Sequence, residues 1–211
     1  MSGRIDHIVI GADNLISGTR ILENKLNTKF ISGGEHKIMG THNNLLKLQK
    51  EIYLEVIANN PNIESIPHSR WFSLDKLETK EKIKKSPRSL CWMLAVDNIE
   101  DVVNNCGYHP GEILQLSRGD LKWKVTVPSD GSLIDNGVLP FLIEWPKNIH
   151  PSKNLTNSRI KLNNINLFHP KVNNTKNIIN NLIKSDLINI FEGLPKIEFN
   201  LETINEKIII D

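Results

Sequence analysis

Two ionisable residues, His7 and Glu55, stand within short apolar segments of this sequence. His7 interrupts the apolar segment 5–10, and Glu55 interrupts the apolar segment 53–57. An ionisable side chain in such a segment needs a partner, a ligand or a cavity, because burial of an unpaired charge is unfavourable. A His and a Glu together can bind a divalent metal ion or act as an acid–base pair. Each also has a simpler interpretation, His7 as a hydrogen-bonded core residue and Glu55 as a surface residue of an edge strand.

Other polar and aromatic residues occur where they can contribute to a binding pocket. Two glycine-containing segments, 33–36 and 40–43, lie between the apolar segments, and the second ends with His42 and Asn43. The glycines permit a tight turn across the mouth of a cavity that His42 and Asn43 can line. Further along the chain, Arg118 and Trp123 can recognise a carboxylate and an apolar group. Arg118 can equally pair with Asp120 at the surface.

The elements that must position these residues follow from the hydrophobic periodicity. The hydrophobic pattern of residues 4–11 alternates as in a strand. Asp13 or Asn14 is a candidate N-cap for a helix that ends near Leu26. Three more strands are predicted at 30–34, 45–48 and 52–58, which gives the order strand–helix–strand–strand–strand. The charged segment from Pro61 to Pro87 predicts a connector with one or two helices, one of them over 71–85.

The same order of elements returns from Ser89 onwards. Residues 5–14 align without a gap with residues 89–98, and both segments run from a strand into an Asp-Asn pair that can cap a helix. The second helix begins at Ile99. Strands at 113–117, 121–128 and 139–145 complete the second unit. A repeat of this length is typical of a duplicated domain.

A third unit follows Arg159. It has predicted strands at 160–168, 187–191, 196–202 and 207–210 and a helix near 175–184 with Asn174 as its cap. We therefore predict an α+β fold divided into a first module (1–60), a helical connector (61–87), a second module (88–155) and a C-terminal βαββ half-module (156–211). Because its strands need a partner edge, the half-module should pack on the paired modules or on a second subunit.

Several short motifs point to a known family. They are Asp6-His7 with Asp13, the two glycine segments, Tyr53-Leu54-Glu55, Arg88 before Cys91-Trp92, Leu121-Lys122-Trp123, residues 139–145 and His150-Pro151. Through these motifs, residues 4–155 resemble the glyoxalase-like domain family of the vicinal oxygen chelate superfamily. The resemblance implies paired βαβββ modules in a curved, open mixed sheet with the active site on its concave face. It also implies that His7 and Glu55 occupy the first module's metal-ligand positions.

The second module departs from the metal-binding pattern that the resemblance implies. Cys91 aligns with the position of an imidazole ligand. Glu144 lies near the second carboxylate position, but aligning residues 53–55 with 141–143 places Ile143 there, and a slip of one residue moves a side chain to the other face. His7, Glu55 and Glu144 are candidate ligands for Mg, Mn, Fe or Ni, whereas a Cys91 thiolate would favour Zn.

Two classes of function remain. The first is a lyase, isomerase or ring-cleaving oxygenase that uses His7 and Glu55 as metal ligands or, without a metal, Glu55 as general base and His7 as its partner. The second is a metal-free protein that sequesters a small molecule, as resistance proteins of the superfamily do, with Arg118, Trp123, His42, Asn43 or Glu144 as contacts. Cys91 favours the second class, and His7 with Glu55 favours the first, which we prefer.

Composition limits the partners. The chain has 211 residues, of which 39% are hydrophobic and 24% charged, as in an ordinary globular protein. Its net charge of +2 does not indicate nucleic-acid binding. No apolar segment approaches the ~20 residues of a membrane span, and two cysteines supply no disulfide framework. We expect a cytoplasmic, bacterial-type protein with a small-molecule ligand, no nucleic-acid or membrane partner, and a homodimer of the kind in which some superfamily members swap modules.

Overall fold

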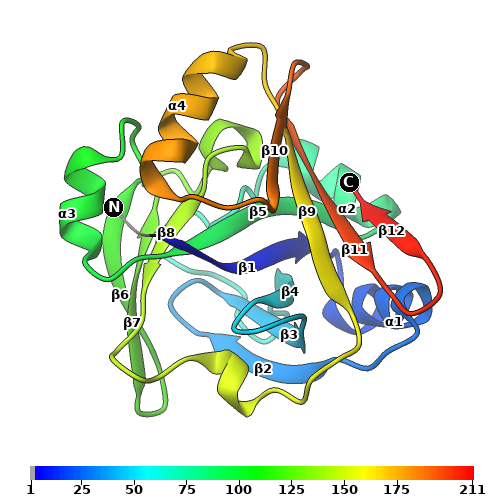
Figure 1. Cartoon of the computed structure of the whole chain (residues 1–211). Coiled ribbons are helices and arrows are strands. Elements are labelled where there is room, and N and C mark those ends of the chain that lie inside the picture. The colour runs from blue at the N-terminus through cyan, green and yellow to red at the C-terminus, as the bar shows by residue number, and fades with distance from the viewer. Residues whose placement is uncertain (1–2) are drawn as a thin grey trace.

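A computed structural model describes residues 3–211 of the chain. Its main sheet has eight strands in the order β2-β3-β4-β1-β5-β8-β7-β6. The first module consists of β1 (Arg4–Gly11), α1 (Leu15–Leu26), β2 (Ile31–His36), β3 (Thr41–Lys47) and β4 (Tyr53–Asn59). The second consists of β5 (Arg88–Ala95), α3 (Ile99–Asn105), β6 (Glu112–Arg118), β7 (Leu121–Val127) and β8 (Phe141–Glu144). The predicted α+β fold with two βαβββ modules in a curved, open mixed sheet is confirmed (Figure 1).

The two modules meet along β1 and β5, which pair in antiparallel orientation. Within each module the first strand is parallel to the last, β1 to β4 and β5 to β8. The sheet curls far enough for its two edge strands, β2 and β6, to contact each other. Because side chains alternate between the faces of a strand, the inward-facing residues of both modules share one interior.

Asparagine caps start the helix of each module. The side chain of Asn14 accepts a hydrogen bond of 3.0 Å from the backbone N–H of Ser17, and Asn98 does the same for Asp101 at 3.0 Å. Both bonds satisfy a donor that the first helical turn leaves unpaired. Among residues 3–211, no helix is long and apolar enough to cross a membrane.

The connector contains one α-helix, α2 (Leu77–Lys85), which begins later than the predicted start at residue 71. Phe72 and Ser73 have φ values of 58° and 57°, in the left-handed region that a right-handed helix does not use. Trp71 and Phe72 are instead buried and packed against the interior of the sheet. Apolar spacing alone could not separate these two residues from the helix that follows.

The C-terminal unit forms its own four-stranded sheet in the order β10-β9-β11-β12. It contains β9 (Lys161–Phe168), α4 (Val172–Leu182), β10 (Ile188–Phe191), β11 (Lys196–Glu202) and β12 (Lys207–Ile210). All four predicted strands are present, so the unit has one strand more than the name βαββ half-module counts. Asn174 lies inside α4 and does not cap it, since the helix begins at Val172.

This unit packs on the paired modules of its own chain. Strand β11 contacts β5, and Figure 1 shows β9 and β11 passing across β5. The Ser89 hydroxyl donates a hydrogen bond of 2.8 Å to the carbonyl of Ile197. The side-chain amide of Gln49 bonds both backbone groups of Leu162, at 2.8 and 2.7 Å. The homodimer stays a prediction.

Candidate functional site

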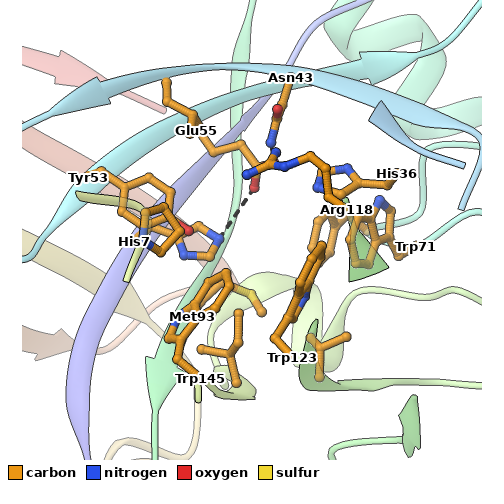
Figure 2. A pocket seen from close by; sticks show the side chains of 15 residues that line it. His7, His36, Asn43, Tyr53, Glu55, Trp71, Met93, Arg118, Trp123 and Trp145 are labelled. Atoms are coloured by element: carbon orange, nitrogen blue, oxygen red, sulfur yellow. Dashed lines mark hydrogen bonds and ion pairs between the residues drawn. The ribbon is translucent and has the colours of Figure 1, made fainter. Parts of the chain in front are cut away.

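A small cavity lies inside the curled sheet, between the two modules (Figure 2). Polar side chains from the first module, among them His7, Asn43 and Glu55, form one wall, and apolar or aromatic side chains such as Met93 and Trp123 form the other. The volume open to the centre of a water molecule is about 30 Å³. That is room for roughly two waters, so a substrate must displace a side chain to enter.

Asp6, His7 and Glu55 form a hydrogen-bonded row at the polar wall. Nδ1 of His7 lies 2.5 Å from Oδ1 of Asp6, and Nε2 of His7 lies 3.3 Å from Oε2 of Glu55. All three residues are buried. Figure 2 shows His7 and Glu55, from the neighbouring strands β1 and β4, pointing toward each other. The two residues singled out in the sequence are thus brought together in one cavity.

Each residue of this row stabilises the charged form of its neighbour. Burial on its own lowers the pKa of His7, but hydrogen bonds to Asp6 and Glu55 outweigh it and raise the pKa to about 9. Burial likewise opposes ionisation of the two acids, but hydrogen bonds from His150 and His7 hold the pKa of Asp6 well below its usual range. Hydrogen bonding to His7 and its charge lower the pKa of Glu55. At neutral pH an imidazolium therefore lies between two carboxylates.

Two neighbours fix the orientation of the pair. The side-chain amide of Asn43 donates a hydrogen bond of 2.5 Å to Oε1 of Glu55. The ring of Tyr53 stacks on the imidazole of His7, with centroids 4.4 Å apart and planes at 19°. The carboxylate of Glu55 is therefore held by donors on both oxygens.

The far side of Asp6 is held by the end of the second module. Its Oδ2 accepts a hydrogen bond of 2.8 Å from Nε1 of Trp145 and lies 3.0 Å from Nε2 of His150. Trp145 also lines the cavity. Residues from both modules thus converge on one buried carboxylate.

Arg118 supplies a positive charge without a protein partner. Its side chain lines the cavity, and Figure 2 shows it reaching toward Asn43 and Glu55. Within residues 3–211, the Arg118 side chain makes no hydrogen bond or ion pair, and the surface pair with Asp120 does not form. Trp123, from the adjacent strand, is buried and lines the same cavity. An anionic group of a ligand could therefore pair with the Arg118 guanidinium.

The cavity residues that the sequence did not single out include His36, Trp71 and Phe72. His36 is buried, and burial lowers its pKa to about 4, so it is a neutral imidazole at neutral pH. Its edge faces the ring of Trp71 at 4.9 Å, and Trp71 stacks on Phe72 at 4.8 Å. Their signal in the sequence is weak, because the two aromatics belong to a connector whose left-handed turn has no proline or glycine at residues 72 and 73 to mark it.

The structure does not bring His42 to the cavity. His42 alternates with Asn43 along β3, so when Asn43 faces inward His42 lies on the opposite face. A ligand in the cavity can therefore contact Asn43 but not His42.

Glu144 also lies away from the cavity. Its Oε2 accepts a hydrogen bond of 2.7 Å from the backbone N–H of Ile99 at the start of α3, and its Oε1 lies 3.6 Å from Nζ of Lys124. Ile143 lines the cavity in its place, in agreement with the alternative register. A difference of one position in a strand exchanges the inward and outward faces.

Cys91 is fully buried and outside the cavity, while Met93, two residues further along β5, lines it. Burial raises the pKa of the Cys91 thiol well above its ordinary value, and the side chain does not face the other candidate ligands in the cavity.

These residues do not form the donor set of a divalent metal site. In the part of the chain that the structure describes, no group of three or more His, Cys, Asp or Glu side chains is arranged to hold a metal ion. The second module presents Met93 and Ile143 to the cavity, and neither supplies the nitrogen or oxygen donor that completes such a site. His7 and Glu55 are directed at each other.

Comparison with solved structures shows the fold. A protein from Staphylococcus aureus, described as hypothetical, is similar over 99% of this chain and 84% of its own, with a TM-score of 0.55 and 18% identity. A methylmalonyl-CoA epimerase in selenomethionine form has a TM-score of 0.44 and 18% identity over 68% of this chain and 95% of its own. The epimerase from Mycobacterium tuberculosis has a TM-score of 0.41 and 14% identity over 67% of this chain and 87% of its own.

Comparison of sequences shows the family. No curated protein matches this chain. The model of the glyoxalase-like domain matches residues 5–183, which include both modules, the connector and the first part of the C-terminal unit. The chain therefore belongs to the glyoxalase-like domain family, as the motifs around His7 and Glu55 predict.

Proposed function

We propose that this protein is an enzyme that transfers a proton at a carbon atom next to the carbonyl group of a small carboxylic acid. The observation that supports this most is the pair of His7 and Glu55, 3.3 Å apart in a cavity that also contains the unpartnered guanidinium of Arg118. Their atoms lie close enough to contact one substrate together. Because the donor set does not fit a metal ion, the mechanism uses the protein side chains.

Glu55 is the general base in this mechanism. The C–H bond of the substrate breaks, its proton passes to the Glu55 carboxylate, and its electron pair moves toward the carbonyl oxygen to give an enolate. Protonation of the enolate on its opposite face or at another atom completes an isomerisation. If the proton on Glu55 is first replaced by one from solvent, its return to the same carbon completes an exchange with solvent. The lowered pKa of Glu55 keeps it ionised but makes it a weak base, so stabilisation of the enolate must supply much of the rate.

His7 and Arg118 supply that stabilisation. His7 carries a positive charge at neutral pH and lies beside the base. Arg118 can bind a carboxylate with two parallel hydrogen bonds, which orients the substrate. In a cavity lined largely by buried side chains, two cations stabilise a developing oxyanion more strongly than they would in bulk water.

Deuterium exchange tests this proposal without a known substrate. The protein is incubated in D₂O with pyruvate, 2-oxobutyrate or acetoacetate, and loss of the C–H signals is followed by proton NMR. We expect exchange above the buffer rate with at least one compound. The Glu55→Gln variant should lose it, whereas Glu51→Gln, changed at an exposed residue of the turn before β4, should retain it. Exchange at the buffer rate, or equal rates for the wild type and Glu55→Gln, would contradict the proposal.

A second candidate is binding without reaction. The apolar character of Met93 and Ile143 on the second wall favours it, since a cavity with one polar wall can hold an acid without transforming it. In that case the same acids quench the fluorescence of Trp71, Trp123 and Trp145, which line the cavity, but undergo no exchange.

A further inference from the structure

A second hollow adjoins the cavity on the other side of Arg118. It has a volume of about 230 Å³, compared with about 30 Å³ for the cavity itself. Leu45, Arg118 and Pro151 line both spaces, so they form the partition between them. We call this second hollow the outer chamber; its apolar lining consists of Ile31, Leu45, Leu121, Ile149, Pro151 and Leu155.

The outer chamber is an apolar surface that the chain leaves partly open. Ile31 and Ile149 are 44% and 50% exposed, although both are large aliphatic residues. Leu45 and Leu155 are buried and form with Tyr53 a cluster separate from the main core. Since Tyr53 stacks on His7, this cluster is also the wall between the outer chamber and the row of ionised residues.

Arg118 is the movable part of the partition. Its Cδ packs against Gly34, where an added Cβ would lie 2.9 Å away, so the absence of a side chain at Gly34 lets the arginine cross the gap between β2 and β6. No hydrogen bond or ion pair within the described chain restrains its guanidinium. Rotation about its side-chain bonds would join the two spaces, because Arg118 lines both of them.

We propose that the outer chamber binds the aliphatic tail of the substrate, which would then be a 2-oxo acid with an extended side chain. This inference rests on the proposed function, because it places the reacting carbon beside Glu55 and the carboxylate on Arg118. The tail attached to the reacting carbon cannot remain in a cavity with room for about two waters. The space on the other side of Arg118 has a mainly apolar lining, which suits a hydrocarbon chain.

A series of 2-oxo acids of increasing length tests the outer chamber. Pyruvate, 2-oxobutyrate, 2-oxopentanoate and 2-oxohexanoate are titrated into the wild-type protein, and Kd is measured from tryptophan fluorescence. We expect Kd to fall by about fourfold for each added methylene, the change that burial of one such group gives. A Kd that does not change with chain length, or no binding by any member, would overturn the inference.

Two aspartate variants test whether the dependence of Kd on chain length arises in the outer chamber. Ile149→Asp puts a charge at the exposed edge of the outer chamber, which should reduce the dependence of Kd on chain length. Ile16→Asp is the matched control, because Ile16 lies on α1, is 78% exposed and lines neither space. It should keep the wild-type dependence. Equal behaviour of the two variants would count against the outer chamber.

The exchange experiment separates the two proposals. Exchange of pyruvate together with a Kd independent of chain length would refute the outer chamber and leave the proposed reaction intact. A strong dependence on chain length without exchange would support the chamber and refute the reaction.

Discussion

His7 and Asp6 are consecutive residues of β1, yet Nδ1 of His7 lies 2.5 Å from Oδ1 of Asp6. Consecutive side chains of a regular strand point to opposite faces. Here the pairing of β1 with β5 shifts between Ile5 and His7, and Asp6 falls in the irregularity. The shift lets the carboxylate turn toward the imidazole, and it is a recurrent way to redirect a side chain beside a functional site.

Replacement of Asp6 by Asn should lower both the stability and the pKa of His7. Removing one charge from a buried pair leaves the other without compensation and typically reduces the free energy of unfolding by about 3–5 kcal/mol. Urea denaturation measures the first effect, and NMR titration of the His7 imidazole measures the second. The control Asp120→Asn, at an exposed residue of the β6–β7 turn, should change neither. An unchanged His7 pKa would show that Asp6 does not determine its charge.

The stability of the protein should fall as the pH rises from neutral to alkaline. The pKa of His7 is raised from 6.5 to about 9, so protonation stabilises the folded state fully below pH 6.5, and this stabilisation is lost as the pH rises through 9. The upper limit of the change is about 3 kcal/mol. Urea denaturation between pH 6 and 10 measures it. His68→Gln, changed at an exposed histidine, should retain the decline, and a constant stability over this range would contradict the assignment.

Loss of Arg118 should weaken the binding of carboxylic acids. Hydrogen bonds to charged groups contribute about 1.5–3 kcal/mol, so Arg118→Gln should raise the Kd for pyruvate by roughly 10- to 100-fold. Lys122→Gln, which removes a nearby positive charge outside the cavity, should have little effect. If both variants weaken binding equally, the overall positive charge of the β6–β7 hairpin is responsible, and not a direct contact with Arg118.

A side chain at residue 34 should displace Arg118. Gly34 has a φ of 116°, and an added Cβ would lie 2.9 Å from Cδ of Arg118. Gly34→Ala should therefore reduce the free energy of unfolding by about 1 kcal/mol or more and raise the Kd for pyruvate. Gly107→Ala is the control for the backbone effect alone. Gly107 also has a positive φ, 81°, but the atom nearest to an added Cβ would be 3.8 Å away. A normal Kd for Gly34→Ala would show that the arginine accommodates the methyl group.

Replacement of Glu144 should affect stability and not exchange. Its carboxylate accepts a hydrogen bond from the first residue of α3, so Glu144→Ala should lower the free energy of unfolding by about 1–2 kcal/mol. The rate of deuterium exchange should equal that of the wild type. A large loss of deuterium exchange in a folded Glu144→Ala variant would show that Glu144 takes part in the reaction.

The sequence was sufficient to predict the two modules, because strand alternation and the repeated Asp-Asn pair are local patterns. The meeting of His7 and Glu55 in one cavity was expected from the resemblance to the glyoxalase-like family. It was not sufficient for Trp71 and Phe72, whose left-handed turn carries no glycine at residues 72 and 73. The role of Asp6 was hidden as well, since a regular strand would direct it away from His7. Glu144 and Ile143 differ by a single position, and only the pairing of β8 with β5 decides which of them faces inward.

The contacts of the C-terminal sheet have a consequence for assembly. Gln49 ties this sheet to the first module, and Ser89 ties it to the second. Any exchange of modules between two chains would have to break one of these attachments, so the C-terminal sheet favours pairing of the two modules within a single polypeptide. A dimer of this protein would then associate through outer surfaces while each subunit keeps its own complete cavity.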